Sequence, residues 1–477
     1  MEPTFASFQD ERQFYQQRIA DLESQLAQRD ARIADLEQKV AFLTEQVAKL
    51  SKNSSNSSKP PSSDIVNPPK SGPSDGQPRK QGGQPGHNGA HRQPFSLDQI
   101  DEVYEDIPDH CPKGHDLSGQ PLLEPRIHQQ AERVEKPVKI TEHRRYAKRC
   151  PICDQIVYAD LSEGVAGDPL FGPRLTALAA YMKGALHTTY SGLEDFSRDV
   201  LGLTISRSLL CNMIARVSAT LQPAYDELGE HVPTAPVLNI DESGWKDNGV
   251  KYWLWIFATN TISLFVLARS RSSKVLYEVL GATWSGTIVS DFFSAYVKYA
   301  NTLQQFCLAH LIRDIKFLTT LPDPMEQAFG TLLLSQFRRL FHLWHRRDKI
   351  PKERFDPLMQ KIQNRIFVLA QRENLPKHSR RLARRIRKHG GALFRFLFDP
   401  LVSPTNNLAE QSIRHSVLNQ RLTQGSRSEM GRRWNERIFT VVGTCRKQGR
   451  SAWQFLCDTV SAHYCHMPMP SLIPQTY

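Results

Sequence analysis

Two short apolar runs that each end in an aspartate decide the fold: Val237-Leu-Asn-Ile-Asp241 and Thr287-Ile-Val-Ser-Asp291. Both have the length and composition of buried strands. Between them, Tyr252–Ala258 and Ile262–Leu267 are predicted as two more strands with a hairpin-like link, and Ser272–Leu280 as a helix. The predicted order is strand, strand, strand, helix, strand, with an acid at the end of the first and last strands.

This order is that of the ribonuclease H-like fold, in which the first and fourth strands lie side by side. We therefore predict an α/β catalytic domain in which Asp241 and Asp291 are neighbours, with a fifth strand at Leu303–Cys307. Two adjacent carboxylates repel each other unless a cation lies between them. Their hard oxygen ligands suit Mg²⁺.

A third carboxylate is expected from a later helix, and Glu410 is the candidate. Thr405 or Asn406 can cap that helix, which places Glu410 close to its first turn. Three such acids support phosphoryl transfer by two metal ions without a side-chain nucleophile. Each acid alone is more often a surface residue, and Glu410 could simply pair with Arg414. The strand order together with the paired aspartates favours the catalytic interpretation.

The positive charge of the chain is concentrated in one segment. The 477 residues contain 61 Lys and Arg against 49 Asp and Glu, a net charge of +12. The segment Arg338–Arg395 has 18 basic and 4 acidic residues, so it carries +14 and the rest of the chain −2. We predict a helical insertion between Asp291 and Glu410 that either lays cations along DNA or is a solvated helix surface. Its densest cations are Arg380, Arg381, Arg384, Arg385, Arg387 and Lys388.

The motif Cys307-Leu-Ala-His310 follows the predicted fifth strand. As a zinc site a lone C-x-x-H pair is weak. His310 either approaches the catalytic groups or a phosphate, or is a packed histidine at a helix start. Arg313, Arg414 and Arg421 are further candidate DNA contacts.

The first fifty residues repeat apolar side chains in a 3-4 alternation that Arg12 and Arg29 interrupt. Such a heptad pattern predicts a coiled coil ending at Ser51 and self-association, most simply as a parallel dimer. The alternative is an amphipathic helix packed on its own domain. The following Ser-, Pro- and Gly-rich stretch has almost no apolar residues, which predicts a flexible linker.

A cysteine cluster follows the linker. Cys150-Pro-Ile-Cys153 is a C-x-x-C knuckle of the kind that tetrahedral zinc requires. Cys111 with His115, or else with His110, could complete a Cys₃His site in a zinc-ribbon-like module. The alternatives are free thiols or a ribbon without metal.

Three predicted helices come next, at Arg174–Leu186, Tyr190–Leu201 and Ser206–Leu221. The last two, with a glycine between them, are compatible with a helix-turn-helix whose recognition helix carries Arg207 and Asn212. An ordinary helical bundle fits the same pattern.

With these motifs in place, the chain resembles the transposases of the insertion sequence 66 family over nearly its whole length. The most specific pieces are Asn53–Asp64, Arg79–Gly89, Asp241-Glu-Ser, Lys251-Tyr-Trp-Leu-Trp, Asp291-Phe-Phe-Ser-Ala-Tyr296, Cys307-Leu-Ala-His310 and Asn406-Asn-Leu-Ala-Glu410. The resemblance implies an Asp-Asp-Glu triad of Asp241, Asp291 and Glu410 with Mg²⁺ or Mn²⁺. Two positions depart from the family pattern: Gly114 stands where a zinc-ligating Cys is expected, and only Arg421 remains of the basic and aromatic residues that usually follow Glu410.

The resemblance also implies partners. They are double-stranded DNA at the element ends and at the target, a second copy of the chain, and accessory proteins of the same element. Apolar runs too short to span a bilayer, the lack of a signal peptide and only eight cysteines lead us to expect a cytoplasmic protein. The resemblance implies that it is bacterial and nucleoid-associated when bound to DNA. The rival interpretations are a nuclease of the same fold without strand transfer and a catalytically inactive DNA-binding regulator.

The predicted domain organisation has seven parts. They are a coiled coil (1–51), a linker (52–100), a zinc-finger-like domain (101–166), a helical DNA-binding region (167–233), the catalytic domain (234–320 and 400–445), the basic helical insertion (321–399) and a C-terminal extension (446–477).

Overall fold

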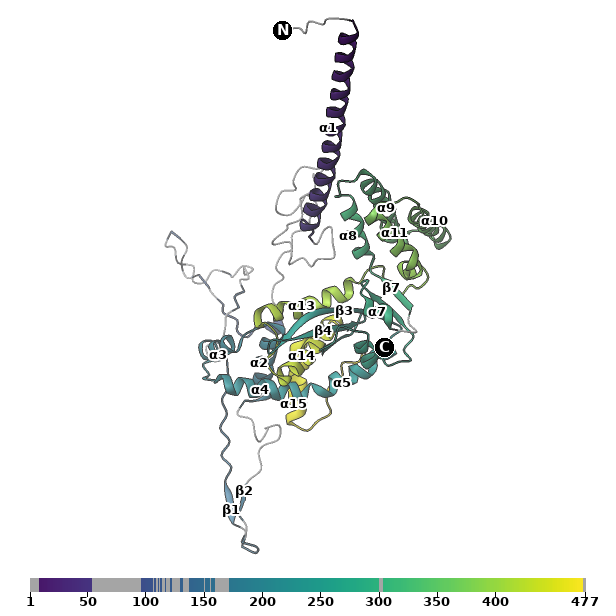
Figure 1. The fold of residues 1–477 in the computed structure, drawn as a ribbon. Coiled ribbons are helices and arrows are strands. Elements are labelled where there is room, and N and C mark those ends of the chain that lie inside the picture. The colour runs from purple at the N-terminus through teal and green to yellow at the C-terminus, as the bar shows by residue number, and fades with distance from the viewer. Residues whose placement is uncertain are drawn as a thin grey trace.

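The main sheet of this computed structural model has the strand order β5-β4-β3-β6-β7. Figure 1 labels β3, β4 and β7 of this sheet. β3 (Val237–Asp247) pairs antiparallel with β4 (Val250–Ala258), which pairs antiparallel with β5 (Ser263–Ala268). β3 also pairs parallel with β6 (Thr287–Ser290), which pairs parallel with β7 (Leu303–Phe306). The predicted adjacency of the first and fourth strands is confirmed. The mixed five-stranded sheet is consistent with a ribonuclease H-like core.

The structure describes residues 8–53, 96–105, 107–108, 110, 112–113, 116, 121, 129–131, 137–149, 151–154, 156–158, 171–299 and 303–474. Three of the four predicted zinc ligands, Cys111, His115 and Cys150, lie outside these residues. Cys153 lies inside them and is an exposed free thiol. It follows β1 (Ala147–Arg149), which pairs antiparallel with β2 (Ile156–Tyr158). The zinc site and the domain boundaries stay predictions.

The prediction that the first strand ends at Asp241 is wrong. β3 continues for six more residues because Asn248 and Gly249 form a tight two-residue turn that pairs Asp247 with Val250. Both turn residues have positive φ, 48° and 80°, as this kind of hairpin turn requires. Asp241 therefore lies in the middle of a strand, and the β3–β4 hairpin extends beyond it.

The edge strand β5 is covered by α14 (Glu429–Lys447). Side-chain oxygens of Glu436, Thr440 and Thr444 accept hydrogen bonds from the backbone N–H groups of Leu267, Phe265 and Ser263, at 2.7, 3.0 and 3.1 Å. The three acceptors are spaced four residues apart, so they lie along one face of the helix. This row of bonds satisfies an edge that would otherwise be open to pairing with another chain.

A helical layer packs on the same core as the sheet. It consists of α2 (Pro173–Ala185), α3 (Tyr190–Asp199), α4 (Arg207–Thr220), α5 (Gln222–His231) and α15 (Ala452–Tyr464). The helices predicted here are confirmed, and Ser206 caps α4 by accepting from Leu209 N–H at 3.4 Å. Buried residues of α2, α4, α5, α14 and α15 belong to one hydrophobic cluster with the sheet.

The segment between β7 and the helix that carries Glu410 is helical, as predicted. It contains α8 (Leu308–Leu318), α9 (Pro324–Trp344), α10 (Lys352–Ala370), α11 (Lys377–Lys388) and α12 (Gly390–Leu393). These helices share a second hydrophobic cluster with β6 and β7. Figure 1 shows α9, α10 and α11 as a bundle beside the sheet, connected to it by α8.

The N-terminal helix α1 (Phe8–Leu50) is long and ends one residue before the predicted position. The short elements of the chain are η2 (Leu97–Gln99), η3 (Val232–Thr234), α6 (Lys274–Leu280), α7 (Ser294–Lys298), η4 (Arg347–Lys349) and η5 (Arg395–Leu397). Among the described residues, no helix combines the length and apolarity that crossing a bilayer demands.

Candidate active site

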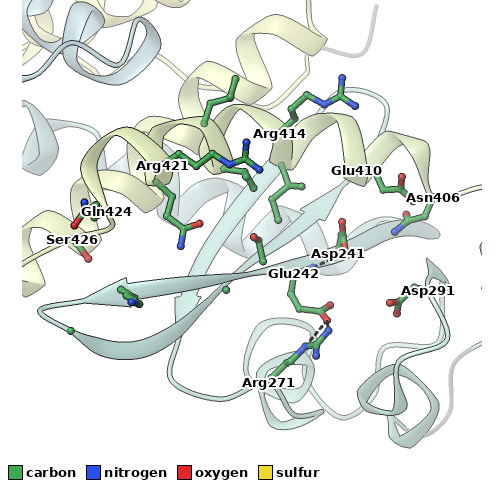
Figure 2. Close-up of a pocket in the computed structure, with 18 of the residues that line it drawn as sticks. Asp241, Glu242, Arg271, Asp291, Asn406, Glu410, Arg414, Arg421, Gln424 and Ser426 are labelled. Atoms are coloured by element: carbon green, nitrogen blue, oxygen red, sulfur yellow. Dashed lines mark hydrogen bonds and ion pairs between the residues drawn. The ribbon is translucent and has the colours of Figure 1, made fainter. Parts of the chain in front are cut away.

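A groove of about 1420 Å³ runs between α13 (Asn407–Thr423) and the β3–β4 hairpin. Figure 2 shows α13 lying across the strands, with acids at one end of the groove and Gln424 and Ser426 at the other. The charged residues that line it are Asp241, Glu242, Asp291 and Glu410, and the cations Lys246, Arg271, Arg313, Arg414, Arg421 and Arg427.

The sheet register places Asp241 and Asp291 level with each other. Asn239 on β3 pairs with Val289 on β6, and each aspartate comes two residues later on its own chain segment. Residues two apart lie on the same side of a strand. Although 50 positions apart in sequence, the two side chains therefore lie on one side of the sheet at the same height (Figure 2).

Glu410 is brought to these aspartates by the start of α13, which Asn406 ties to β3. The Asn406 amide donates to Ile240 O at 2.8 Å and accepts from Asn239 Nδ2 at 3.0 Å. Ile240 directly precedes Asp241, so these bonds set the first turn of α13, which carries Glu410, beside Asp241. The expectation that the side chain of Asn406 caps the helix is wrong, because its amide is engaged with β3 instead.

Each of the three acids keeps one carboxylate oxygen without a hydrogen-bond partner among the described residues. Asp241 Oδ1 accepts from Glu242 N–H at 2.9 Å, and Asp291 Oδ1 accepts from Phe293 N–H at 2.8 Å. Glu410 Oε1 faces Cys307 Sγ at 3.9 Å. The second oxygen of each acid is free to bind another group.

Burial raises the pKa of all three acids, and repulsion from neighbouring acids adds to the shift at Asp241 and Glu410. The pKa of Asp241 lies well above its usual value because of burial first, then the charges of Glu242 and Asp291. Burial likewise raises the pKa of Asp291 and Glu410, while Arg271 and Arg313 partly oppose the shift. A site that penalises negative charge in this way is stabilised by a bound cation.

Glu242 differs from the other three acids because both of its oxygens are engaged. Arg271 forms an ion pair with Oε1 at 2.7 Å, and the buried hydroxyl of Tyr296 donates to Oε2. The Arg271 guanidinium itself lies over the rings of Phe293 and Trp253, 4.0 and 4.5 Å from their centroids. Glu242 is thus held in place as a structural acid rather than left open to a ligand.

Cys307 joins the segments that carry Asp291 and Glu410. Its N–H donates to Ser290 O at 2.8 Å, and its sulfur accepts from Asn406 N–H at 3.2 Å. Burial raises the pKa of the Cys307 thiol to about 11, so it stays protonated. Ligand atoms of Cys307, His310 and Glu410 lie within 4.8 Å of one another, but a protonated thiol is a poor partner for a hard cation.

His310 lies beside Glu410, with Nδ1 3.6 Å from Oε1. Burial and the charge of Arg313 lower the pKa of His310 to about 4. The imidazole is therefore neutral at pH 7, and the contact is not an ion pair there.

A comparison with known families identifies the chain. The family model described as Transposase IS66 family matches residues 169–433, more than half of the sequence. The chain belongs to this family. A second model, for a family of unknown function (DUF6444), matches residues 2–93. No curated protein matches the chain.

Membership of the transposase IS66 family implies DNA transposition, an activity of phosphoryl-transfer enzymes. The matched residues contain all four acids of the groove and the helices α2 to α13 around them.

The groove contains some of the residues predicted to contact DNA in this IS66 family transposase. His310, Arg313, Arg414 and Arg421 line it. Arg207 and Asn212 do not; they are exposed at the start of α4, where Arg207 forms an ion pair with Glu194 at 2.7 Å. The cations of α11 do not line it either.

Sequence reasoning missed Glu242, Arg271 and Asn406 as site residues. Glu242 had a local signal, since it directly follows Asp241. Asn406 was indicated only as a possible cap of its helix and as part of the motif that ends at Glu410. Arg271 had no local signal, because its partner Glu242 comes from a distant part of the chain. The part of the β3–β4 hairpin beyond Asp241, which forms one wall of the groove, was also missed, although Asn248-Gly249 is a strong hairpin signal in the sequence.

Proposed function

We propose that Asp241, Asp291 and Glu410 form the catalytic triad of a DNA transposase that cuts the ends of its mobile element and joins them to target DNA. The observation that carries the proposal is the convergence of three carboxylates, each with an unengaged oxygen, in one groove. The fourth acid there, Glu242, is paired with Arg271, and the other charged residues of the groove are cations. Acids at the reaction centre and cations around it suit a phosphodiester substrate.

The donor set fits Mg²⁺ or Mn²⁺. The free oxygens of Asp241, Asp291 and Glu410 are hard ligands, and their raised pKa values indicate that a bound cation would relieve the repulsion between them. When bound, such ions activate a water or a 3′-hydroxyl and stabilise the leaving oxygen.

The residues of the chain supply positioning and charge. Arg414 and Arg421, about two turns apart on the same face of α13, face the groove together with Lys246 on the hairpin. These cations hold the phosphates that flank the scissile bond. Asn406 and Cys307 keep Glu410 at the level of the aspartates, and the ion pair of Glu242 with Arg271 keeps a fourth acid away from the reacting phosphate.

Two further surfaces are proposed to contact DNA. On α4, Arg207 and Asn212 are exposed and can face a groove of the duplex. On α11, internal bonds engage three cations: Arg385 with Asp314, Arg387 with Ala370 O, and Arg380 with Leu375 O. This leaves Lys377, Arg381, Arg384 and Lys388 as the α11 cations that are available to phosphates.

Asp241→Asn tests the triad. The substitution removes one charge with almost no change in volume, so metal-dependent cleavage and strand transfer should fall by at least ~1000-fold. Binding to element ends should stay nearly intact. The readouts are cleavage and joining of a labelled duplex that carries an element end, with gel-shift binding measured in parallel.

Asp356→Asn is the matched control, because Asp356 is an exposed carboxylate of α10 that forms no ion pair within the described part of the chain. Purified Asp241→Asn protein that still cleaves DNA contradicts the triad. Wild-type protein that cuts but never joins supports the nuclease alternative. Specific binding without any metal-dependent cleavage supports the inactive regulator.

A further inference from the structure

We propose that a basic groove between α9 and α10 binds the phosphate backbone of duplex DNA beyond the catalytic groove. This inference rests on the proposed function, since it assumes that the groove at Asp241 holds DNA. The site consists of Arg338, Arg339 and His342 on α9 and Leu358, Lys361 and Arg365 on α10, around a cavity of about 570 Å³.

The charge of this groove is uncompensated. Its lining includes four permanently charged cations, Arg338, Arg339, Lys361 and Arg365, and no carboxylate. In the part of the chain that the structure describes, none of the four forms an ion pair, unlike Arg385 and Arg432, which do. Cations gathered on a concave surface without counter-charges repel one another and attract a polyanion.

The shape of the groove supports an extended ligand rather than a buried small molecule. The cations are exposed, and one wall is the half-exposed aliphatic side chain of Leu358. Aliphatic surface with several separated cations gives no converging set of hydrogen bonds for one compact anion. Sugar-phosphate backbone, which presents charges at regular spacing, fits such a lining.

The bundle holds these cations on a rigid support. Glu326 at the start of α9 is buried and accepts from the N–H groups of His378 and Ser379 at the start of α11, both at 2.8 Å. This carboxylate satisfies N-terminal donors of α11 and fixes α9 to it. The two walls of the groove are held together by the hydrophobic core, in which Phe337 and Leu340 of α9 lie in one buried cluster with Ile362 and Ile366 of α10.

The bundle is connected to the catalytic groove through α8. Arg313 on α8 lines the catalytic groove, and α8 packs against α9 and α11 (Figure 1). DNA bound at Asp241 that continues past Arg313 would thus run toward the bundle. The basic groove should contact the duplex at a distance from the scissile bond, and its contribution should depend on DNA length.

The test is the double variant Arg339→Gln/Arg365→Gln in the full chain, with a matched control, Lys349→Gln/Arg372→Gln. The control removes two exposed cations of the same insertion that do not line the groove. Binding is measured on two duplexes with an element end: one that stops close to the scissile bond, and one that continues for about two more helical turns, roughly 20 base pairs. Thermal unfolding of each protein reports whether it is folded.

For the longer duplex, the slope of log affinity against log salt should fall by about 2 in the groove variant, one for each lost phosphate contact. Between 50 and 200 mM salt, that change corresponds to roughly 16-fold. The shorter duplex and the control variant should keep the wild-type slope. A second variant, Arg338→Gln/Lys361→Gln, should reproduce the result, so a folding defect in one protein does not decide the test.

Three outcomes overturn the inference: an unchanged slope for both groove variants, an equal loss for both duplexes, or an equal loss in the control. If inorganic phosphate protects Arg339 and Arg365 from chemical modification while long DNA does not, the groove binds a small anion instead. A wild-type protein that binds no DNA contradicts the proposed function itself, and the two failures are thereby distinguished.

Discussion

At the scale of single residues, the position of Glu410 depends on a side chain that performs no chemistry. Asn406 is buried, and its amide bonds both Ile240 O and Asn239. Its backbone N–H meets Cys307, whose own N–H is bonded to Ser290 O, next to Asp291. One asparagine thus connects the three chain segments that carry the acids.

Asn406→Ala should reduce both stability and activity. It leaves Ile240 O and Asn239 Nδ2 buried without partners, at a cost of about 1–3 kcal/mol for each group. A displacement of Glu410 by about 1 Å should lower the cleavage rate on the order of 100-fold. Denaturant unfolding and single-turnover cleavage measure the two effects.

The neighbouring Asn407→Ala is the control, because Asn407 has the same chemistry but is exposed and lies outside the groove lining. It should change stability by less than about 0.5 kcal/mol. Asn406→Ala protein that unfolds and cleaves as the wild type does would show that α13 is held at Glu410 by other contacts.

The sequence predicted the three acids of the triad, but it did not predict the residues that give the neighbouring Glu242 a different, structural role. Asp241 and Asp291 follow from strand order, since two parallel neighbours in register must bring equivalent positions together. The sequence alone does not show that Glu242 has a different role from Asp241 and Asp291. Its partners Arg271 and Tyr296 lie 29 and 54 residues away and reach it only through the folded sheet.

At the scale of elements, hydrogen bonds attach α13 to β3 at both ends of the helix, so the groove between them is bounded at both ends. Beyond the Asn406 end, Ser426 N–H donates to Lys246 O at 2.9 Å, and Asn248 N–H donates to Ser426 O at 2.8 Å. The Ser426 hydroxyl also donates to Asp247 at 2.8 Å. The hairpin tip and the end of α13 therefore form one continuous wall.

Gly425→Ala should break this wall. Gly425 has φ +103°, and a Cβ there would lie 2.0 Å from Lys246 O. Backbone on both sides leaves no room for relief, so we expect a loss of about 2–4 kcal/mol in stability together with weaker DNA binding. Chemical denaturation and duplex binding are the measurements.

Gly202→Ala separates conformational strain from the clash. Gly202 also has positive φ, +67°, but no atom lies within 4 Å of its Cβ position. It should lose only about 1 kcal/mol and keep DNA binding. Equal losses for both glycines would mean that the contact with Lys246 contributes nothing.

Element prediction succeeded where the pattern is local and failed where it depends on tertiary contact. The helix α2 starts at a proline, and α3 and α4 start at the side-chain caps Thr189 and Ser206, so their positions were predicted closely. The extension of β3 to Asp247 was not, because the polar residues after Asp241 pair only with β4 and with the loop at Ser426. No local signal indicates that Glu436, Thr440 and Thr444 satisfy the edge of β5.

At the scale of the whole molecule, the positive charge has two locations rather than one. Cations line the catalytic groove beside the acids, and others line the separate groove between α9 and α10. The sequence indicated the second as a segment with +14, but it could not distinguish cations with internal partners from those without. That distinction needs the contacts of Arg385 and Arg387, which lie within the bundle.

The long helix α1 has a contact with the insertion and a second face without one. Glu45 pairs with His378 at 3.0 Å, and Lys52 lies over the Phe317 ring at 3.9 Å. The heptad stripe points elsewhere: Leu43 and Val47 are each 61% exposed. Packing on its own chain therefore leaves the stripe free, and we propose that a second copy covers it.

Leu36→Lys/Leu43→Lys in the full chain should abolish this self-association, because each dimer would bury four cations at its apolar seam. The mass from light scattering should fall from that of a dimer to that of one 54.4 kDa chain.

The control variant Ala31→Lys/Gln38→Lys adds the same charge on the opposite face of the helix and should leave the dimer intact. Since the contact of Glu45 with the insertion uses a different face of α1, cleavage of a single element end should persist in the monomer, while paired joining of two ends should be lost. A monomeric wild-type chain, or a double variant that stays dimeric, would contradict the coiled-coil assignment and require another surface to bring two ends together.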